Sequence, residues 1–201
     1  RYELRALSAQ INPHFLYNTL DTIVWMAEFN DSKRVVEVTK SLAQYFRLAL
    51  NQGHEQISLR DEIDHVRQYL FIQKQRYGDK LQYEIEEDES LADYKLPKLV
   101  LQPLVENAIY HGIKEIERQG MIRVTAAAEE GQLILSIYDN GRGFDVNASM
   151  DATLLRLGGV GLKNVDQRLR LQFGDDYHME IQSEPDKFTQ ISLYLPLVTD
   201  D

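Results

Sequence analysis

The chain has 201 residues, of which 43% are hydrophobic and 27% are charged, so it is long enough for one or two ordinary globular domains. Its formal net charge is −10 and it has no block of Lys or Arg, which argues against nucleic acid or an anionic membrane as the main partner. It contains no cysteine, which excludes disulfides and thiolate metal sites, and no apolar run approaches the roughly 18–20 residues of a membrane span.

Residues 1–50 predict two helices. The first carries two apolar stripes on almost opposite faces, Leu4, Leu7 and Ile11 and then Leu16, Leu20, Ile23 and Ala27. His14, Asn18 and Asp21 lie on a polar face away from the second stripe. Because the sequence begins inside this amphipathic pattern and without Met, we expect the chain to be a fragment of a longer protein.

The second helix follows the short connection "FNDSK", which predicts an antiparallel helical hairpin. Its apolar residues recur at steps of three and four, at Val35, Val38, Leu42, Tyr45 and Ala49. Two helices have too little core to be stable alone, so we expect two copies to form a four-helix bundle.

The stretch "QINPHFLYNTLD" places Pro13 inside the predicted first helix, where a proline costs roughly 3 kcal/mol. We expect a bend beside His14, because the carbonyl near Ala9 loses its donor. Such a bend would help His14 to reach a partner group, whereas the alternative is a static kink that the bundle tolerates.

The chain then changes to an α+β pattern. Ser58 and Asp61 form a capping-box pattern at the start of a helix, on whose charged face His65 is expected at the surface. "LQYEIEE" predicts an edge strand, and a helix is expected from Pro97 to Gly112. A hairpin, a helix that ends at Gly174 and two closing strands complete the pattern.

Three motifs of this second part point to a nucleotide. "ENAIYHG" offers Asn107 and His111 at one end of a helix, "DNGRGF" puts Asp139 after an apolar strand, and "GGVGLKN" precedes a helix. Glycines before a helix let the backbone N–H groups approach phosphate, while an Asn can hold a hydrated Mg²⁺ that bridges phosphates. Each motif alone is weak, but their order on these elements favours a nucleotide site over plain turns.

Together with "NPHFLYNTLD", these motifs resemble the phosphoacceptor motif, the N box and the two glycine boxes of LytS/YesM-type sensor histidine kinases, closer to the YesM-like branch. The resemblance extends roughly from Leu7 to Pro196. It implies a dimerisation and phosphotransfer hairpin at residues 1–53. A Bergerat-type (GHKL) ATP-binding sandwich would follow at residues 54–201, with its ATP lid at about 144–157.

The resemblance also assigns roles to individual residues. It implies that His14 is the phosphoacceptor, with ATP and Mg²⁺ as cofactors. By resemblance, Asn107 holds Mg²⁺ and His111 contacts phosphate. Asp139 reads adenine, Gly141 and Gly143 form its loop, and Thr189 reaches adenine through water. Gly159, Gly161 and Leu162 match the second glycine box.

Two features of the phosphoacceptor motif bear on the chemistry. Phe15 occupies the position after His14 where many other histidine kinases have an acid, so the base for His14 is unassigned. Asp21 is the one acid proposed, and the alternative is that Asn12 or Asn18 fixes the tautomer of the ring. Asn18 lies one helical turn beyond His14 and matches a polar residue that, in related kinases, helps water to attack the aspartyl-phosphate of the response regulator. The alternative is an Asn on a solvated face.

Three other functions compete with a histidine kinase. An ATPase of the gyrase/Hsp90 type carries a Glu four residues before the N-box Asn, and Pro103 stands there, although Glu106 remains a candidate base. A serine kinase of the anti-sigma type lacks the "NPHFLYN" helix. A non-catalytic dimeric scaffold is disfavoured by the intact Asn107, Asp139 and glycines.

The resemblance further implies the partners and the location. We expect a homodimer, a cognate response regulator, an upstream sensor region missing from this chain, and no nucleic acid partner. The chain would be the cytoplasmic portion of a membrane sensor.

Overall fold

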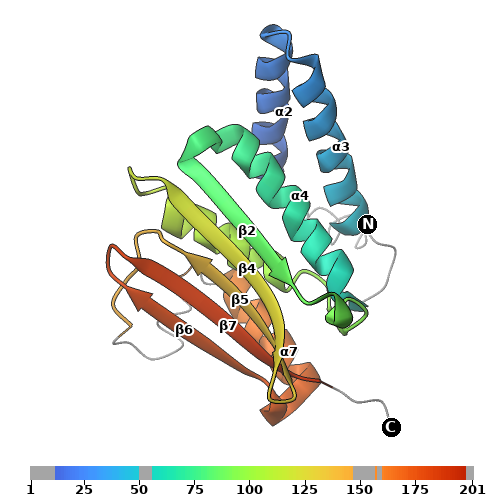
Figure 1. Cartoon of the computed structure of the whole chain (residues 1–201), viewed down its shortest axis with the longest axis vertical. Helices are drawn as coiled ribbons and strands as arrows, with labels where there is room; N and C mark the ends of the chain where they lie inside the picture. Colours follow the sequence, from blue (N-terminus) through green and yellow to red (C-terminus); the bar gives the residue numbers. More distant parts are fainter. Residues whose placement is uncertain (1–11, 50–55, 147–156, 158–159, 198–201) are drawn as a thin grey trace.

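The computed structural model describes residues 12–49, 56–146, 157 and 160–197. A helical hairpin stands beside an α/β sandwich, and one long helix lies between them (Figure 1). The predicted order, a helical part followed by an α+β sandwich, is confirmed.

The hairpin consists of α2 (Pro13–Glu28) and α3 (Ser32–Ala49). The turn between them is short, with Asn30 in the left-handed region at φ 56°, so the helices run antiparallel. The predicted stripe of α3 is confirmed, since Val38, Leu42, Tyr45 and Ala49 are its buried residues.

The start of α2 corrects the prediction for Pro13. Asn12 is extended, with φ −72° and ψ 104°, and its side chain accepts hydrogen bonds from the backbone N–H groups of His14 (3.1 Å) and Phe15 (3.3 Å). Pro13 is therefore the first residue of a capped helix, a position that needs no N–H donor, and not a helix-interior proline. The expected stripe of Leu4, Leu7 and Ile11, and the carbonyl of Ala9, lie outside the described residues.

The buried face of α2 also differs from the prediction. Phe15, Thr19 and Met26 are buried, whereas Leu20 is 45% exposed. The packing face is thus rotated away from the predicted stripe, because α3 covers the side of α2 next to it. Leu16 and Ile23 of the expected stripe are half-buried against the core, whereas Leu20 and Ala27 are exposed.

Helix α4 (Leu59–Tyr77) connects the hairpin to the sandwich. Ser58 caps it by accepting a hydrogen bond from the Asp61 N–H at 3.1 Å, which confirms the predicted capping pattern. The expected surface position of His65 is wrong: its side chain is buried against Tyr45, with a ring-centroid distance of 4.3 Å. Helix α3 covers the face of α4 that the sequence predicts to be charged and exposed. This long-range contact cannot be predicted from the hydrophobic periodicity of α4.

The sandwich is built on a five-stranded sheet in the order β2-β4-β5-β7-β6. Its strands are β2 (Leu81–Glu87), β4 (Gly120–Glu129), β5 (Gln132–Asp139), β6 (His178–Glu184) and β7 (Phe188–Pro196). Among the described strands, β2 alone pairs in parallel, with β4. The predicted edge position of β2, the β4–β5 hairpin and the two closing strands are confirmed. A small second sheet joins β1 (Gln56–Ser58) to β3 (Lys95–Pro97).

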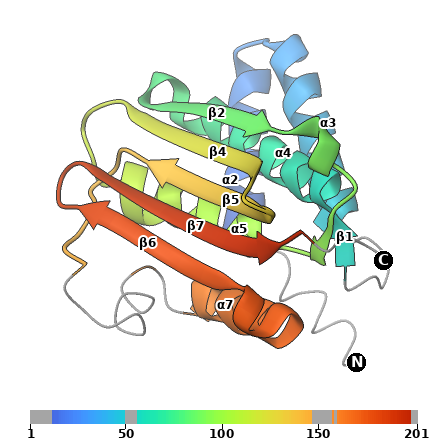
Figure 2. The same ribbon diagram turned by 60° about the horizontal axis from the view of Figure 1, so that its bottom comes forward.

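Helices α4, α5 (Leu101–Asn107) and α7 (Val160–Phe173) gather on one face of the large sheet (Figure 2). Short 3₁₀ segments η1 (Gly78–Lys80), η2 (Glu89–Leu91) and η4 (Gly174–Asp176) connect the elements. None of the described helices combines the length and apolar character that a membrane span requires.

Helix α5 begins and ends differently from the prediction. Pro97 belongs to strand β3, and the helix starts at Leu101. At its other end the chain does not stop at Gly112 but continues through a π-helical turn, η3 (Ala108–Ile113). A π-turn adds a residue per turn and is frequent at functional sites, so it changes which side chains face the sheet.

A buried carboxylate takes the place of a local cap for α5. Glu62 of α4 accepts hydrogen bonds from the N–H groups of Leu99 (2.9 Å) and Leu101 (2.8 Å). Burial raises the Glu62 pKa to about 7, against the opposing effect of these bonds. Leu99 adopts φ 59°, an unfavourable value for Leu, so Glu62 helps to fix a strained start of the helix that carries Asn107.

Candidate functional site

A pocket of about 130 Å³ lies between the α5–η3 helix, the sheet and the loop after β5. Its polar lining residues come from four separate segments: Asn107, His111, Asp139, Arg142 and Thr189. The apolar lining includes Leu104, Ile137, Phe144, Leu157 and Ile191. A small pocket with apolar walls and a few convergent polar groups is typical of a ligand site.

Asp139 ends β5 and is 4% exposed. Its Oδ1 accepts a hydrogen bond from the Gly141 N–H at 2.9 Å, and burial raises its pKa to about 7 despite that bond. Gly112 and Gly141 approach the carboxylate and each other so closely that a Cβ on either one would overlap its neighbour. The close approach explains why both positions need glycine.

Gly143 has a different requirement. It adopts φ 59°, and a Cβ there would overlap the carbonyl oxygen of Glu184. The loop after β5 is thereby pressed against the β6–β7 turn, which holds it at the mouth of the pocket.

Thr189 is the direct neighbour of Asp139 in the pairing of β5 with β7. Its buried hydroxyl lies 2.9 Å from the Ser183 Oγ, which also accepts from the Phe144 N–H at 2.9 Å. Sequence reasoning missed Ser183. A serine in an alternating strand carries no distinguishing pattern until the sheet register is known.

Asn107 and His111 come from consecutive turns of the α5–η3 helix. The Asn107 side chain is buried beside the pocket, and its Nδ2 has no hydrogen-bond partner among the described residues. A buried amide without a partner is costly, so it is available to a ligand. His111 also lines the pocket but is exposed.

Mg²⁺ held at this site would need ligands in addition to the described side chains. The described residues hold no cluster of three acidic, histidine or cysteine side chains that could bind a metal alone. Asn107 would supply one oxygen, and phosphates and water would complete the octahedral coordination that Mg²⁺ requires.

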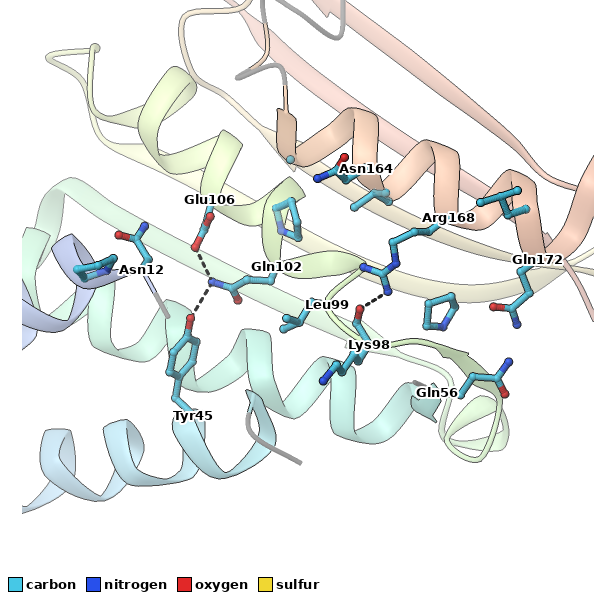
Figure 3. A pocket seen from close by; sticks show the side chains of 16 residues that line it. Asn12, Tyr45, Gln56, Lys98, Leu99, Gln102, Glu106, Asn164, Arg168 and Gln172 are labelled. Atoms are coloured by element: carbon cyan, nitrogen blue, oxygen red, sulfur yellow. Dashed lines mark hydrogen bonds between the residues drawn. The ribbon is translucent and has the colours of Figure 1, made fainter. Parts of the chain in front are cut away.

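Of the second glycine box, Gly161 lines a larger groove of about 980 Å³ and Leu162 is buried. Gly159 lies outside the described residues. The groove runs between the start of α2 and α7, with Asn12, Gln102, Glu106, Asn164 and Arg168 around it (Figure 3).

The phosphoacceptor candidate stands near this groove. His14 is in the first turn of α2, its side chain is exposed, and Asn12 and Pro13 line the groove. Its ring contacts Asn18, whose Nδ2 lies 3.0 Å from His14 Nδ1. The residue directly after His14 is Phe15 and not an acid. Asp21 lies about two helical turns away on the same face, too far to contact the ring.

Arg118 supports the loop that follows Asp139 and was missed by sequence reasoning. Its Nη2 donates to the carbonyl oxygens of Asn140 (2.6 Å), Gly141 (3.0 Å) and Asp186 (3.0 Å). The guanidinium thus joins the loop after β5 to the β6–β7 turn. No local sequence signal marks this residue, since its three partners are distant along the chain.

Comparison with known families agrees with this geometry. Residues 2–81 match the family model for histidine kinase, and residues 92–199 match that for histidine kinase-, DNA gyrase B-, and HSP90-like ATPase. The chain belongs to the histidine kinase family. The resemblance to LytS/YesM-type sensor histidine kinases is therefore confirmed.

Two bacterial sensor kinases and one solved structure are similar to this histidine kinase chain. Over 194 residues it is 38% identical to the sensor histidine kinase YesM of Bacillus subtilis (strain 168) and 39% identical to the sensor histidine kinase BtsS of Escherichia coli (strain K12). Each alignment covers 96% of this chain and 33% of the relative, so the chain spans about a third of their length. The histidine kinase domain of the blue-light activated kinase EL346 from Erythrobacter litoralis shares the fold, with TM-score 0.54, 15% identity, and 96% and 93% of the two chains covered.

Proposed function

We propose that this chain binds ATP with Mg²⁺, transfers the γ-phosphoryl group to His14, and passes it to an aspartate of a response regulator. A ring nitrogen of His14 attacks the γ-phosphorus, a P–N bond forms, and the bond to the oxygen of ADP breaks, so ADP leaves with the electron pair. Such transfer depends mainly on positioning and charge neutralisation.

The order of the site residues across the molecule carries this proposal. Asp139 and Thr189 lie in the small pocket and are assigned to adenine, with Gly141 and Gly143 shaping its loop. Asn107 and His111 lie on the helix beside it, and Gly161 lines the groove that reaches Asn12 and Pro13 at the start of α2. A nucleotide in this direction points its phosphates toward the helix that carries His14.

We assign residues 1–53 to phosphotransfer and dimerisation and residues 54–201 to ATP binding. The lid proposed at 144–157 falls mostly outside the described residues. Gly159, Gly161 and Leu162 are proposed to form the phosphate side of the site, with the α7 N-terminus supplying free N–H groups.

The exposed apolar stripe of α2 supports the proposed homodimer. Tyr17, Leu20 and Val24 are 67%, 45% and 55% exposed, and they lie on the side of α2 opposite its buried face. A second copy that covers this stripe would complete a four-helix bundle.

The His14 face of α2 supports a response-regulator partner. Trp25 and Phe29 are both exposed, their ring centroids are 5.3 Å apart, and they border a groove of about 520 Å³ that also includes Asn18 and Arg34. Asn18 is proposed to orient the water that removes the phosphoryl group from the regulator. An Asn18→Ala chain that dephosphorylates its regulator at the wild-type rate would contradict this role.

We place the chain on the cytoplasmic side of a membrane sensor, by analogy with the sensor kinases that it resembles. The region upstream of this chain would then carry the stimulus.

The experiment is incubation with γ-labelled ATP and Mg²⁺, followed by acid and base treatment of the protein. We expect an acid-labile, base-stable label in the wild type that is absent in His14→Gln and in Asn107→Ala. Label that survives in His14→Gln would assign the acceptor elsewhere, and inorganic phosphate release without any protein label would favour an ATPase.

A further inference from the structure

Phe15 is the neighbour of His14, and it is 2% exposed whereas His14 faces solvent. Its ring lies 4.9 Å from the rings of both Tyr45 and Tyr69, centroid to centroid. These two tyrosines belong to α3 and α4, so a single side chain ties the first turn of the phosphoacceptor helix to the other two helices. Aromatic contacts of this kind add to the free energy of burial and also fix orientation.

Tyr45 continues the contact toward the nucleotide site. The Gln102 Nε2 donates to the Tyr45 hydroxyl at 3.4 Å and to the Glu106 Oε1 at 3.1 Å (Figure 3). Gln102 and Glu106 belong to α5, whose last residue is Asn107. The side chains of Phe15, Tyr45, Gln102 and Glu106 therefore form an unbroken series, called here the hairpin joint, between His14 and Asn107.

The hairpin joint leaves His14 accessible. Asn12 and Pro13 line the same groove as Gly161 and Glu106, and among the described residues the imidazole of His14 has Asn18 as its one side-chain hydrogen-bond partner. An inhibitory contact would bury or block the imidazole of His14. The hairpin joint instead buries the next residue, Phe15, and leaves the imidazole exposed in the first turn of α2.

We propose that Phe15 is a positioning residue for phosphoryl transfer, and that the hairpin joint links the first turn of α2 to the nucleotide-binding helix. The inference rests on the proposed function, since it explains how His14 is held for attack. Phe15 itself takes no part in bond making or breaking.

The test compares Phe15→Leu and Phe15→Ala with Met26→Ala. Met26 is the matched control, because it is also buried in α2 and lies about three turns beyond Phe15 on the same face. For each variant the phosphorylation rate of His14 at saturating ATP, the KM for ATP and the Tm are measured. We expect the rate to fall about tenfold or more in Phe15→Ala and less in Phe15→Leu, with the KM unchanged, because misplacement slows attack.

Met26→Ala should lower the Tm at least as much as Phe15→Leu while it retains a phosphorylation rate close to that of the wild type. Equal losses of phosphorylation rate in Phe15→Leu and Met26→Ala would mean that Phe15 contributes only to packing. A faster phosphorylation rate in Phe15→Ala would mean that the packing of Phe15 inhibits phosphoryl transfer. Either result overturns the proposal.

A second readout needs no phosphoryl transfer and separates this inference from the proposed function. In the wild type, ADP should slow backbone hydrogen exchange at residues 16–19 of α2, and Gln102→Ala should abolish that response while ADP still binds. An ADP response that persists in Gln102→Ala would contradict the hairpin joint even if His14 is phosphorylated. A wild type that shows the response but no phosphohistidine would instead contradict the proposed function alone.

Discussion

At the scale of one residue, the buried carboxyl of Asp139 lowers the stability of the folded chain when it is ionised. Its carboxylate is buried, has one hydrogen bond from the Gly141 N–H, and titrates with a pKa raised to about 7. A carboxyl whose pKa is raised on folding stabilises the protein below its unfolded pKa, and this stabilisation is lost as the pH rises through 7. Ionised Asp139 therefore lowers the free energy of unfolding, as expected for a carboxylate whose role is to bind a ligand.

We therefore predict that Asp139→Asn stabilises the nucleotide-free chain at pH 8, by up to about 4 kcal/mol, and weakens ATP binding strongly. Thermal unfolding at pH 5 and pH 8, with calorimetric titration of ATP, provides the measurement. The gain should shrink at pH 5, where the wild-type carboxyl is protonated. A destabilised variant at pH 8 would show that the carboxylate is better solvated than the described contacts indicate.

His65 is a second residue whose burial can be tested by pH. Burial lowers its pKa to about 4, and neither ring nitrogen has a hydrogen-bond partner among the described residues. Because the unfolded chain binds the proton more readily, wild-type stability attributable to His65 is lost as the pH falls from about 6.5 to 4.

His65→Phe should remove this loss and also remove two unsatisfied polar atoms. We expect a higher Tm than the wild type at every pH, with the difference increasing below pH 6.5. The control is His178→Phe, since His178 is exposed and already stacks on Tyr194. A Tm difference independent of pH would mean that His65 is hydrated in solution.

At the scale of the element, the loop after β5 depends on Arg118. Since one guanidinium nitrogen bonds to three carbonyl oxygens of two segments, Arg118→Ala should let the loop that follows Asp139 move. We expect ATP to bind about three- to tenfold more weakly, roughly the net free energy of one ordinary hydrogen bond, with kcat nearly unchanged. Arg123→Ala, which removes exposed ion pairs with Glu84 and Glu86, is the control.

If both arginine variants bind ATP equally well, the loop keeps its conformation without Arg118. Kd values from titration with ATP, and with inorganic triphosphate as a probe that lacks adenine, would assign any loss to the adenine side. A loss for both ligands would instead indicate a general disturbance of the fold.

The sequence predicted most elements because their patterns are local. The alternation in β5 and β7, the capping pattern of Ser58 and the glycines around Asp139 each depend on a few neighbouring residues. The errors come from contacts between distant segments: α3 covers His65, and Glu62 replaces a local cap for α5. Pro13 was misplaced because the apolar periodicity on both sides suggested one continuous helix, although Asn followed by Pro is also a helix-start pattern.

The candidate site also combines residues that local motifs predict with residues that only tertiary contacts bring in. Asn107, His111, Asp139 and Thr189 all line one pocket, as their motifs implied. Ser183 and Arg118 contribute through register and tertiary contact, for which the sequence carries no local signal.

At the scale of the whole molecule, the exposed stripe on α2 predicts self-association. Replacing Leu20 and Val24 together by Glu puts like charges into the proposed four-helix core, so the dimer should dissociate. Sedimentation of the wild type and the double variant measures this, and Lys33→Gln together with Lys40→Gln, on exposed positions of α3, provides a control with the same charge change. A wild type that sediments as a monomer at high concentration would contradict the bundle.

The measurement that tests the central claim most directly is localisation of the phosphoryl group after incubation with ATP and Mg²⁺. The chain has five histidines, so mass spectrometry at neutral pH can distinguish His14 from His54, His65, His111 and His178. Our account predicts phosphate on His14 alone, lost in Asn107→Ala. Phosphate on another residue, or on His14 with equal yield in Asn107→Ala, would contradict transfer from this pocket to the start of α2.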